Sequence, residues 1–127
     1  MKTVIRKTAF TAALVIGCAA AQLSQAQGGM LHTWGNNDYG QLTNTPVGND
    51  FISVSSQGAY AVAVRKNGTL ASWGYNANGQ VSNTPAGGGF VAAWAGYGMS
   101  TALKSDGTLV SWGDDGQAHL VTTSLRP

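Results

Sequence analysis

Charged residues are scarce in this sequence. Seven Lys or Arg and five Asp make up 9% of the 127 residues, and glutamate is absent; about 25% is typical of soluble chains. This scarcity argues against a helical bundle with a charged surface, and a hydrophobic share of 43% argues against a disordered chain. The strict glycine period of collagen is also missing. An all-β chain with many turns remains, and the 18 glycines agree with it.

Groups that carry catalysis or bind metals are scarce as well. Without glutamate there is no residue to close a calcium-binding loop, zinc ligands are too few, and no Gly-x-Ser-x-Gly nucleophile motif occurs. Asp114, Asp115 and His119 lie close in sequence, but such polar loop residues are usually solvated, and His32 is isolated from them. We therefore expect no enzyme activity, no metal and no cofactor.

The first 26 residues have the order of a secretory signal peptide. Three bases, Lys2, Arg6 and Lys7, precede an uncharged run over residues 8–21, and Ser24-Gln25-Ala26 fits the small-x-small cleavage rule. We predict cleavage after Ala26, with Ala21 as the second choice. The run is shorter than the ~20 residues of a membrane-spanning helix, so an uncleaved anchor is the less favoured alternative. The chain is expected to be secreted or periplasmic, with no membrane span after cleavage.

Signal removal changes what the composition implies. Residues 27–127 keep four bases against five Asp, a net charge of −1, so no basic patch remains for a nucleic-acid partner. The single cysteine, Cys18, leaves with the signal, and the mature domain has no disulfide framework. Val15-Ile16-Gly17-Cys18 also resembles a bacterial lipoprotein processing box, which makes lipid anchoring at Cys18 the minority alternative.

The remainder of the chain is a repeat. Trp34, Trp73 and Trp112 stand 39 residues apart, and each is followed by glycine: Gly35, Gly74 and Gly113. Residues 31–69 align with 70–108 without a gap, with 14 identical pairs in 39. A partial unit follows at 109–117, and the pattern is lost in a degenerate tail at 118–127. A fixed period of this size indicates a solenoid, a propeller or an array.

Each unit is predicted to hold about three antiparallel strands. Residues 60–66 alternate large and small apolar side chains, with Tyr60, Val62 and Val64 on one face, and residues 69–74 follow after Asn67-Gly68. Asn-Gly between two such runs predicts a two-residue hairpin turn in which both residues have positive φ. Residues 99–105 and 108–112 repeat the pattern around Asp106-Gly107, and a further strand is expected at 51–54 and at 90–94. No segment outside the signal has helical periodicity.

Three segments carry a resemblance to a known family. Leu-x-Ser-Trp-Gly-x-Asn-x-x-Gly-Gln-Val at 70–81 is similar to the repeat of the regulator-of-chromosome-condensation (RCC) family, as are residues 34–42 and 106–113. The resemblance implies blades of a seven-bladed β-propeller. Units of 39 residues are closest in length to the bacterial extracellular branch, which includes a propeller-type β-lactamase inhibitor protein. The founder is a nuclear exchange factor for a small GTPase, and that activity does not carry over, because its functional residues cannot be matched here.

The sequence also departs from the family pattern. Thr43 and Ser82 stand where the family often has glycine, and the third unit is shortened at Asp114-Asp115-Gly116-Gln117. Residues 27–127 hold about 2.6 units, whereas a propeller closes with roughly 4–8 blades. The fold class is therefore an all-β partial propeller. Several chains could complete one ring, the array could stay open and capped by its own ends, or the chain could be a piece of a longer repeat protein.

Repeated and variable positions are assigned different roles. The three tryptophans are interpreted as blade-packing residues, with carbohydrate stacking as the alternative, and the glycines after them as close approaches of strands. Gly40-Gln41 and Gly79-Gln80 are expected to hydrogen-bond loop backbone between blades through the Gln amide, with ligand contact as the alternative. Binding is expected at positions that vary between units, namely Asp38, Tyr39, Tyr75 and Asp114. Ordinary turn chemistry is the alternative for these, and it also explains the sequon Asn67-Gly68-Thr69.

These features predict an exported, non-catalytic module that binds an unidentified protein. The alternatives are a structural subunit that donates blades to an oligomeric propeller by self-association, and a truncated fragment without an activity of its own.

Overall fold

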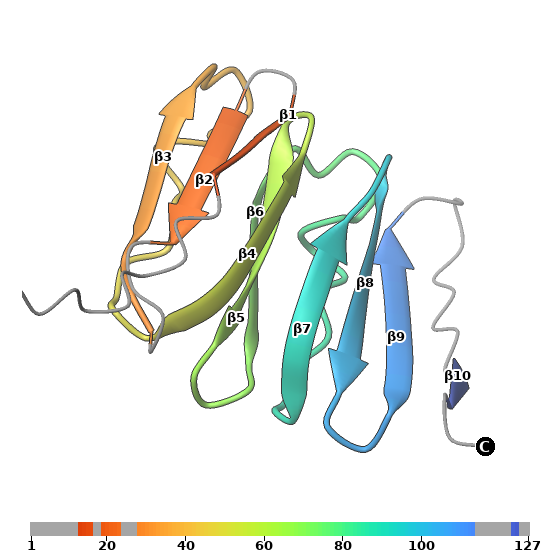
Figure 1. The fold of residues 1–127 in the computed structure, drawn as a ribbon. Coiled ribbons are helices and arrows are strands. Elements are labelled where there is room, and N and C mark those ends of the chain that lie inside the picture. The colour runs from red at the N-terminus through yellow and green to blue at the C-terminus, as the bar shows by residue number, and fades with distance from the viewer. Residues whose placement is uncertain (1–12, 17–18, 24–27, 114–122, 125–127) are drawn as a thin grey trace, which may run out of the picture.

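The chain is described here by a computed structural model that covers residues 13–16, 19–23, 28–113 and 123–124. Throughout these ranges it consists of strands, turns and loops, arranged as three antiparallel sheets that lie side by side (Figure 1). The all-β, propeller-type architecture predicted from the repeat is confirmed. No helix in the described ranges has the length and hydropathy needed to cross a membrane.

Each sheet is a blade built around an antiparallel meander. Blade 1 comprises β1 (Ala13–Ile16), β2 (Ala19–Leu23) and β3 (Leu31–Gly35), and blade 2 comprises β4 (Phe51–Gln57), β5 (Tyr60–Arg65) and β6 (Leu70–Gly74). Blade 3 comprises β7 (Phe90–Ala95), β8 (Met99–Lys104) and β9 (Thr108–Gly113), and β10 (Thr123–Ser124) adds a short fourth strand beside β9. A 39-residue unit therefore runs from the last strand of one blade through the first two strands of the next.

Large and small residues alternate in β5, so each of the two faces of blade 2 packs into its own apolar cluster. Val62 and Val64 are fully buried toward blade 3, where they join Phe90, Ala102 and Trp112 in one apolar cluster. The small residues Ala61 and Ala63 face the other way, in a second cluster with Phe51, Trp73 and the half-buried Leu31. Equivalent register shifts occur after Phe51 and after Phe90, so the repeat extends to the irregularities of its strands.

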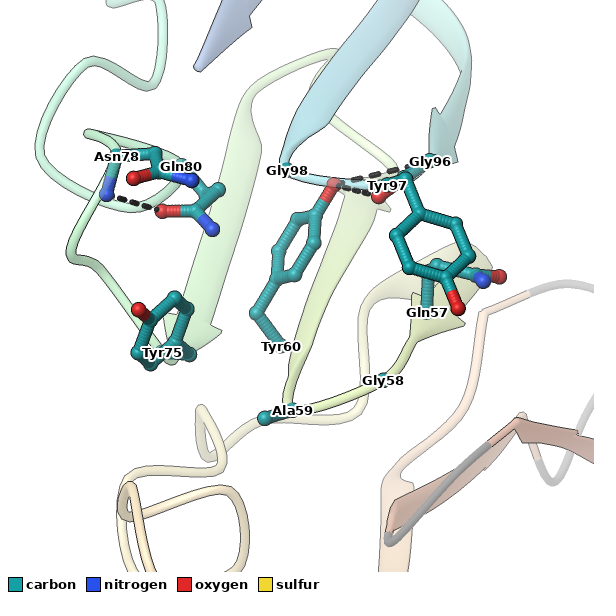
Figure 2. A pocket seen from close by; sticks show the side chains of 10 residues that line it. All are labelled: Gln57, Gly58, Ala59, Tyr60, Tyr75, Asn78, Gln80, Gly96, Tyr97 and Gly98. Carbon is teal, nitrogen blue, oxygen red and sulfur yellow. Dashed lines mark hydrogen bonds between the residues drawn. The ribbon is translucent and has the colours of Figure 1, made fainter. Parts of the chain in front are cut away.

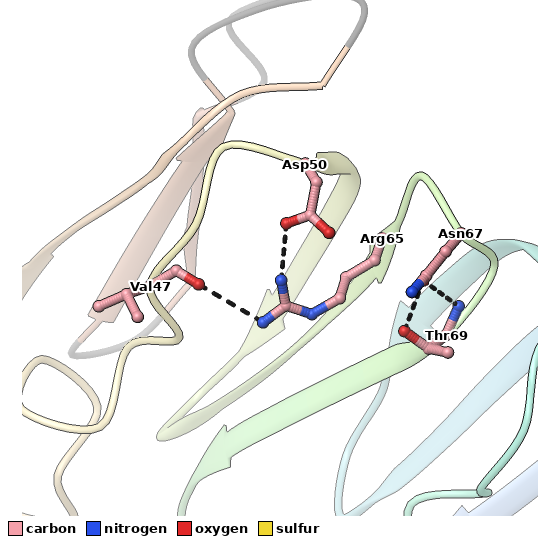
Figure 3. A network of polar contacts seen from close by, with 5 residues as sticks. All are labelled: Val47, Asp50, Arg65, Asn67 and Thr69. Carbon is pink, nitrogen blue, oxygen red and sulfur yellow. Dashed lines mark hydrogen bonds and ion pairs between the residues drawn. The ribbon is translucent and has the colours of Figure 1, made fainter.

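The β5–β6 and β8–β9 hairpins differ from the predicted turn. Only the glycines have positive φ, 83° at Gly68 and 88° at Gly107, and no described non-glycine residue does. The Gly68 N–H donates to the Arg65 carbonyl (2.8 Å), while Arg65 N–H donates to the Thr69 carbonyl (2.9 Å). This is a three-residue loop with glycine in the left-handed position. Asn67 keeps an ordinary backbone because its side chain accepts from the Thr69 N–H and hydroxyl instead (Figure 3).

The repeated tryptophans and glutamines connect neighbouring units. Trp73 Nε1–H donates to the backbone carbonyl of Gln41 (3.0 Å), and Trp112 Nε1–H donates to that of Gln80 (2.9 Å). Both indoles are 3% exposed. The glutamine side chains act within their own loops, where Gln41 Oε1 accepts from Tyr39 N–H and Gln80 Oε1 from Asn78 N–H. The backbone of glutamine, and not its amide side chain, thus makes the contact to the next unit.

Close strand approach accounts for the glycine after tryptophan. Gly74 has φ of 102°, and a side chain there would overlap the Ala59 carbonyl oxygen; Gly113 has the same relation to Gly98. An L-residue at either position would also be strained by its positive φ.

Several sequence predictions fall at the edges of the described chain. Residues 13–16 and 19–23 of the predicted signal form β1 and β2, and β2 pairs with β3 and packs against β4. Cys18 and the site after Ala26 lie outside the described residues, as do Asp114, Asp115, Gly116, Gln117 and His119. Signal cleavage therefore stays a prediction. Part of the degenerate tail, β10, is paired with β9 in the register Thr123–Leu109.

Candidate functional site

The two ends of the blades differ in charge. The β4–β5 and β7–β8 turns lie at the same end as the loops that follow Trp-Gly, and we call this end the rim (Figure 1). The opposite end holds the β5–β6 and β8–β9 hairpins with Arg65, Lys66, Lys104 and Asp106, and also Asp50 at the start of β4. Arg65 pairs with Asp50 there at 2.6 Å (Figure 3). Of the charged residues that the structure describes, Asp38 is the one on a rim loop.

A pocket of about 320 Å³ opens on the rim between blades 2 and 3 (Figure 2). Three segments meet there: the β4–β5 turn, the β7–β8 turn and the loop after β6. The described residues that line the pocket carry no formal charge; they are Gln57, Gly58, Ala59, Tyr60, Tyr75, Asn78, Gln80, Gly96, Tyr97 and Gly98. The wall is thus made of tyrosine rings, side-chain amides and glycine backbone.

Tyr60 fixes the position of the two turns relative to each other. Its buried hydroxyl donates toward the carbonyl oxygens of Gly96 (2.8 Å) and Met99 (2.7 Å). It also accepts from Gly96 N–H (3.1 Å) and from the Ser100 hydroxyl (3.3 Å). Burial raises the pKa of Tyr60 above its ordinary value, and the hydrogen bonds from Ser100 and Gly96 offset part of that rise. This hydroxyl is therefore a contact between blades, fully engaged by blade 3.

The loop after β6 is held by side-chain contacts to its own backbone. Asn76 Oδ1 accepts from the N–H groups of Val81 and Ser82, both at 2.9 Å. Gln80 is 1% exposed, and its Oε1 accepts from Asn78 N–H at 2.9 Å. With its oxygen bound inside the loop, the amide nitrogen of Gln80 is turned toward the pocket (Figure 2). This wall of the pocket therefore presents a hydrogen-bond donor on a fixed loop.

The structure brings two of the four predicted binding residues together. The rings of Tyr39 and Tyr75 meet edge to face, with centroids 4.7 Å apart, so the loops that follow β3 and β6 are neighbours on the rim. Asp38 belongs to the same loop as Tyr39, where its carboxylate accepts from the Asn36 side chain (2.9 Å). Asp114 lies outside the described residues.

Tyr97 was missed by the sequence analysis, and it is the most exposed tyrosine of the pocket at 93%. A signal for it was available in the repeat. Tyr97 occupies the β7–β8 turn at the position that Gly58 holds in the β4–β5 turn. Gly96-Tyr97-Gly98 is too short for a phosphate loop, and Tyr97 is a position that varies between units.

The chemistry that the rim pocket offers is that of neutral side chains. The described residues include no group of three or more His, Cys, Asp or Glu side chains placed to hold a metal. His32 lines a separate hollow beside β3, with Met30 and Val47. The pocket offers aromatic surface and neutral hydrogen-bonding groups, which serve recognition.

Comparisons place this architecture among known folds. No family model matches the sequence, and no curated protein matches it significantly. Among solved structures, human WBSCR16 superposes with a TM-score of 0.65 at 17% identity, over 89% of this chain and 34% of that one. The ectodomain of the Physcomitrella patens receptor kinase CR4 has a TM-score of 0.59 at 24% identity, and the match covers 76% of this chain and 27% of that one. Prp20p of Saccharomyces cerevisiae has a TM-score of 0.61 at 22% identity, and the match covers 83% of this chain and 31% of that one.

The chain thus spans about a third of the length of the structures it matches. A second structure of the yeast protein, there named as yeast RCC1, gives a TM-score of 0.60 at 22% identity. The sequence resemblance and the structural match agree on the same repeat. The described chain has the fold of RCC1-type β-propeller blades.

Proposed function

We propose that this chain is an exported, non-catalytic module that binds another protein through the rim of blades 2 and 3. The observation that carries the proposal is an uncharged pocket lined by Tyr75 and Tyr97, with the Tyr39 ring in contact with Tyr75. Aromatic side chains that are only partly covered in the free protein are the residue type that dominates binding energy at protein interfaces. They lie on loops and turns carried by a repeat scaffold, where such proteins place their specificity.

The structural neighbours support a protein as the partner. Prp20p, which has the same fold, is described with binding properties toward Gsp1p and histones, and a structure of yeast RCC1 contains bound Kap60. Those partners belong to those proteins. The proposal for this chain uses only the observation that blades of this type form protein-binding surfaces.

The test compares two matched variants in a cross-linking capture from the extracellular or periplasmic fraction, followed by binding measurements with the purified partner. Replacing Tyr39 and Tyr75 by alanine should weaken the affinity at least about tenfold, because two aromatic contacts are lost. Val47→Ala is the control, since Val47 is an apolar side chain, 88% exposed, outside the rim pocket. Equal affinity of the double variant and the wild type would overturn the proposal.

Export is tested separately by the intact mass of the protein recovered outside the cytoplasm. Cleavage after Ala26 gives a mature chain that begins at Gln27. Each alternative gives a different mass: cleavage after Ala21, lipid attachment at Cys18, or retention of the whole leader. Finding any of these masses would contradict cleavage after Ala26.

The second candidate is a subunit that donates blades to a shared propeller. Trp34 favours it, because Trp34 is 40% exposed whereas its repeat equivalents Trp73 and Trp112 are 3% exposed. Each buried tryptophan donates its indole N–H to the preceding unit, and Trp34 stands where a preceding blade of another chain would provide that contact. Light scattering on the purified chain tests this candidate: a discrete oligomer without any other protein supports it, and a monomer contradicts it.

A further inference from the structure

The wall of the rim pocket beside Gln80 presents a hydrogen-bond donor. Two backbone acceptors along its wall are already bound, since the Ala59 carbonyl accepts from Tyr75 N–H (2.8 Å) and the Gly96 carbonyl accepts from the Tyr60 hydroxyl (2.8 Å). The side-chain oxygen of Gln80 is bound by Asn78 N–H. On the wall formed by the loop after β6, the group turned toward a ligand is the Gln80 amide nitrogen, which is a donor (Figure 2).

The mouth of the pocket is aromatic. Tyr75 and Tyr97 come from opposite blades and flank the opening, while Tyr60 forms the wall between them (Figure 2). The Tyr75 ring also makes an edge-to-face contact with Tyr39. Each exposed tyrosine ring offers an apolar face with a hydroxyl at its tip, so the mouth favours a flat apolar group with acceptors beside it.

The described lining residues carry no charge, which further restricts the class of ligand that the pocket can bind. Transfer of a charged side chain into a pocket without a partner is costly, which disfavours acidic and basic segments. A proline-containing segment fits all three conditions. It is uncharged, it offers a flat ring to aromatic side chains, and its carbonyls accept hydrogen bonds while proline has no N–H donor.

We infer that the rim pocket takes an uncharged, proline-containing extended segment of the partner protein. A proline ring lies between Tyr75 and Tyr97, and a carbonyl of the segment accepts from Gln80 Nε2. Such segments form the polyproline II helix before they bind, which reduces the ordering cost of association. This inference rests on the proposed function, because it names the chemistry of the partner that the rim would bind.

The experiment uses the full chain and a fluorescein-labelled oligoproline peptide of about eight residues, which spans about 25 Å as polyproline II. Fluorescence anisotropy should give a Kd on the order of 100 µM, typical of a weak single-motif contact. Tyr97→Ala should weaken binding by about tenfold or more. Its ring is so exposed that its removal leaves the fold intact, which circular dichroism verifies. Val47→Ala should bind as the wild type does.

Two other probes separate this ligand class from its competitors. A Gly-Ser peptide of equal length tests extended backbone without proline, and a neutral glucose oligosaccharide tests a glycan against the same tyrosines and amides. In ¹⁵N-labelled protein, the side-chain amide resonance of Gln80 should shift with oligoproline and with neither of the others.

The inference is overturned if oligoproline does not bind, if the Gly-Ser peptide binds equally, or if the oligosaccharide binds in its place. Failure here is distinct from failure of the proposed function. A captured protein whose affinity still depends on Tyr39 and Tyr75 would keep the rim as a protein-binding surface while rejecting proline as its ligand.

Discussion

The Tyr60 hydroxyl joins blades 2 and 3 through contacts to Gly96, Met99 and Ser100. We expect Tyr60→Phe to lower the free energy of unfolding by about 1–3 kcal/mol, because the ring is kept while the Gly96 carbonyl loses a donor and the buried Ser100 hydroxyl loses its acceptor. Urea denaturation measures the change. Tyr75→Phe is the control: it keeps the contact with the Tyr39 ring and should stay within about 0.5 kcal/mol of wild type. Equal losses in both variants would contradict this role for Tyr60.

The same hydroxyl predicts a loss of stability in alkaline solution. Burial raises the pKa of folded Tyr60 above its value in the unfolded chain, so the folded state holds the proton to higher pH. The stability that this provides is fully present below the unfolded pKa, near 10, and is lost as the pH rises through the folded pKa. Denaturation midpoints between about pH 8 and about pH 11 should fall more steeply for wild type than for Tyr60→Phe. Parallel curves would show that Tyr60 is not responsible.

At the scale of the element, the loop between Trp-Gly and the next blade is closed by one asparagine per unit. Asn76 accepts from Val81 and Ser82 N–H groups, as Asn37 does from Leu42 and Thr43. Asn76→Ala should cost about 1–2 kcal/mol, because two N–H groups lose their acceptor. Asn78→Ala should change stability little, since Asn78 is exposed and uses its backbone N–H in the loop. Urea midpoints of the two variants, measured in parallel, distinguish them, and equal midpoints would refute the closing role of Asn76.

The elements also show how far sequence reasoning extends. Alternation in residues 60–66 and the Asn-Gly and Asp-Gly signals placed β5, β6, β8 and β9 to within a residue or two, because period-2 patterning reflects burial on two faces. The turn type was wrong because Asn67 satisfies its side chain with Thr69 and leaves the positive φ to Gly68. Among the variable positions, Tyr39 and Tyr75 meet on the rim, and their role in binding stays a prediction. The pocket could not be predicted from the sequence. The repeat period identifies equivalent residues in successive units, but it does not say which turn of one blade contacts which loop of another.

At the scale of the whole molecule, the two ends of the array are unlike. On blade 2, the Ser55 hydroxyl accepts from Ala95 N–H (3.0 Å), and Tyr60 binds the β7–β8 turn. The equivalent residues on blade 3 are Trp94 and Met99, both about half exposed, and neither reproduces the contact of Ser55 or Tyr60. On the described part of that face, a regular fourth blade would lack the hydrogen bonds that Ser55 and Tyr60 make. Association of chains is therefore expected at the other end, beside β3 and Trp34.

Blade 1 connects this expectation to the predicted signal. β2 is the hydrogen-bonded neighbour of β3 and packs against β4, so cleavage after Ala26 would leave the β3 edge without its partner strand. An unpaired edge recruits strands from other chains. We expect residues 27–127 to form a dimer or larger species in light scattering coupled to size exclusion, and residues 1–127 at equal concentration to have a smaller mass per particle. Circular dichroism on the same fractions should show β structure in both. If both are monomers with the same β signal, β3 does not need β2, and the exposed Trp34 face is not an association surface.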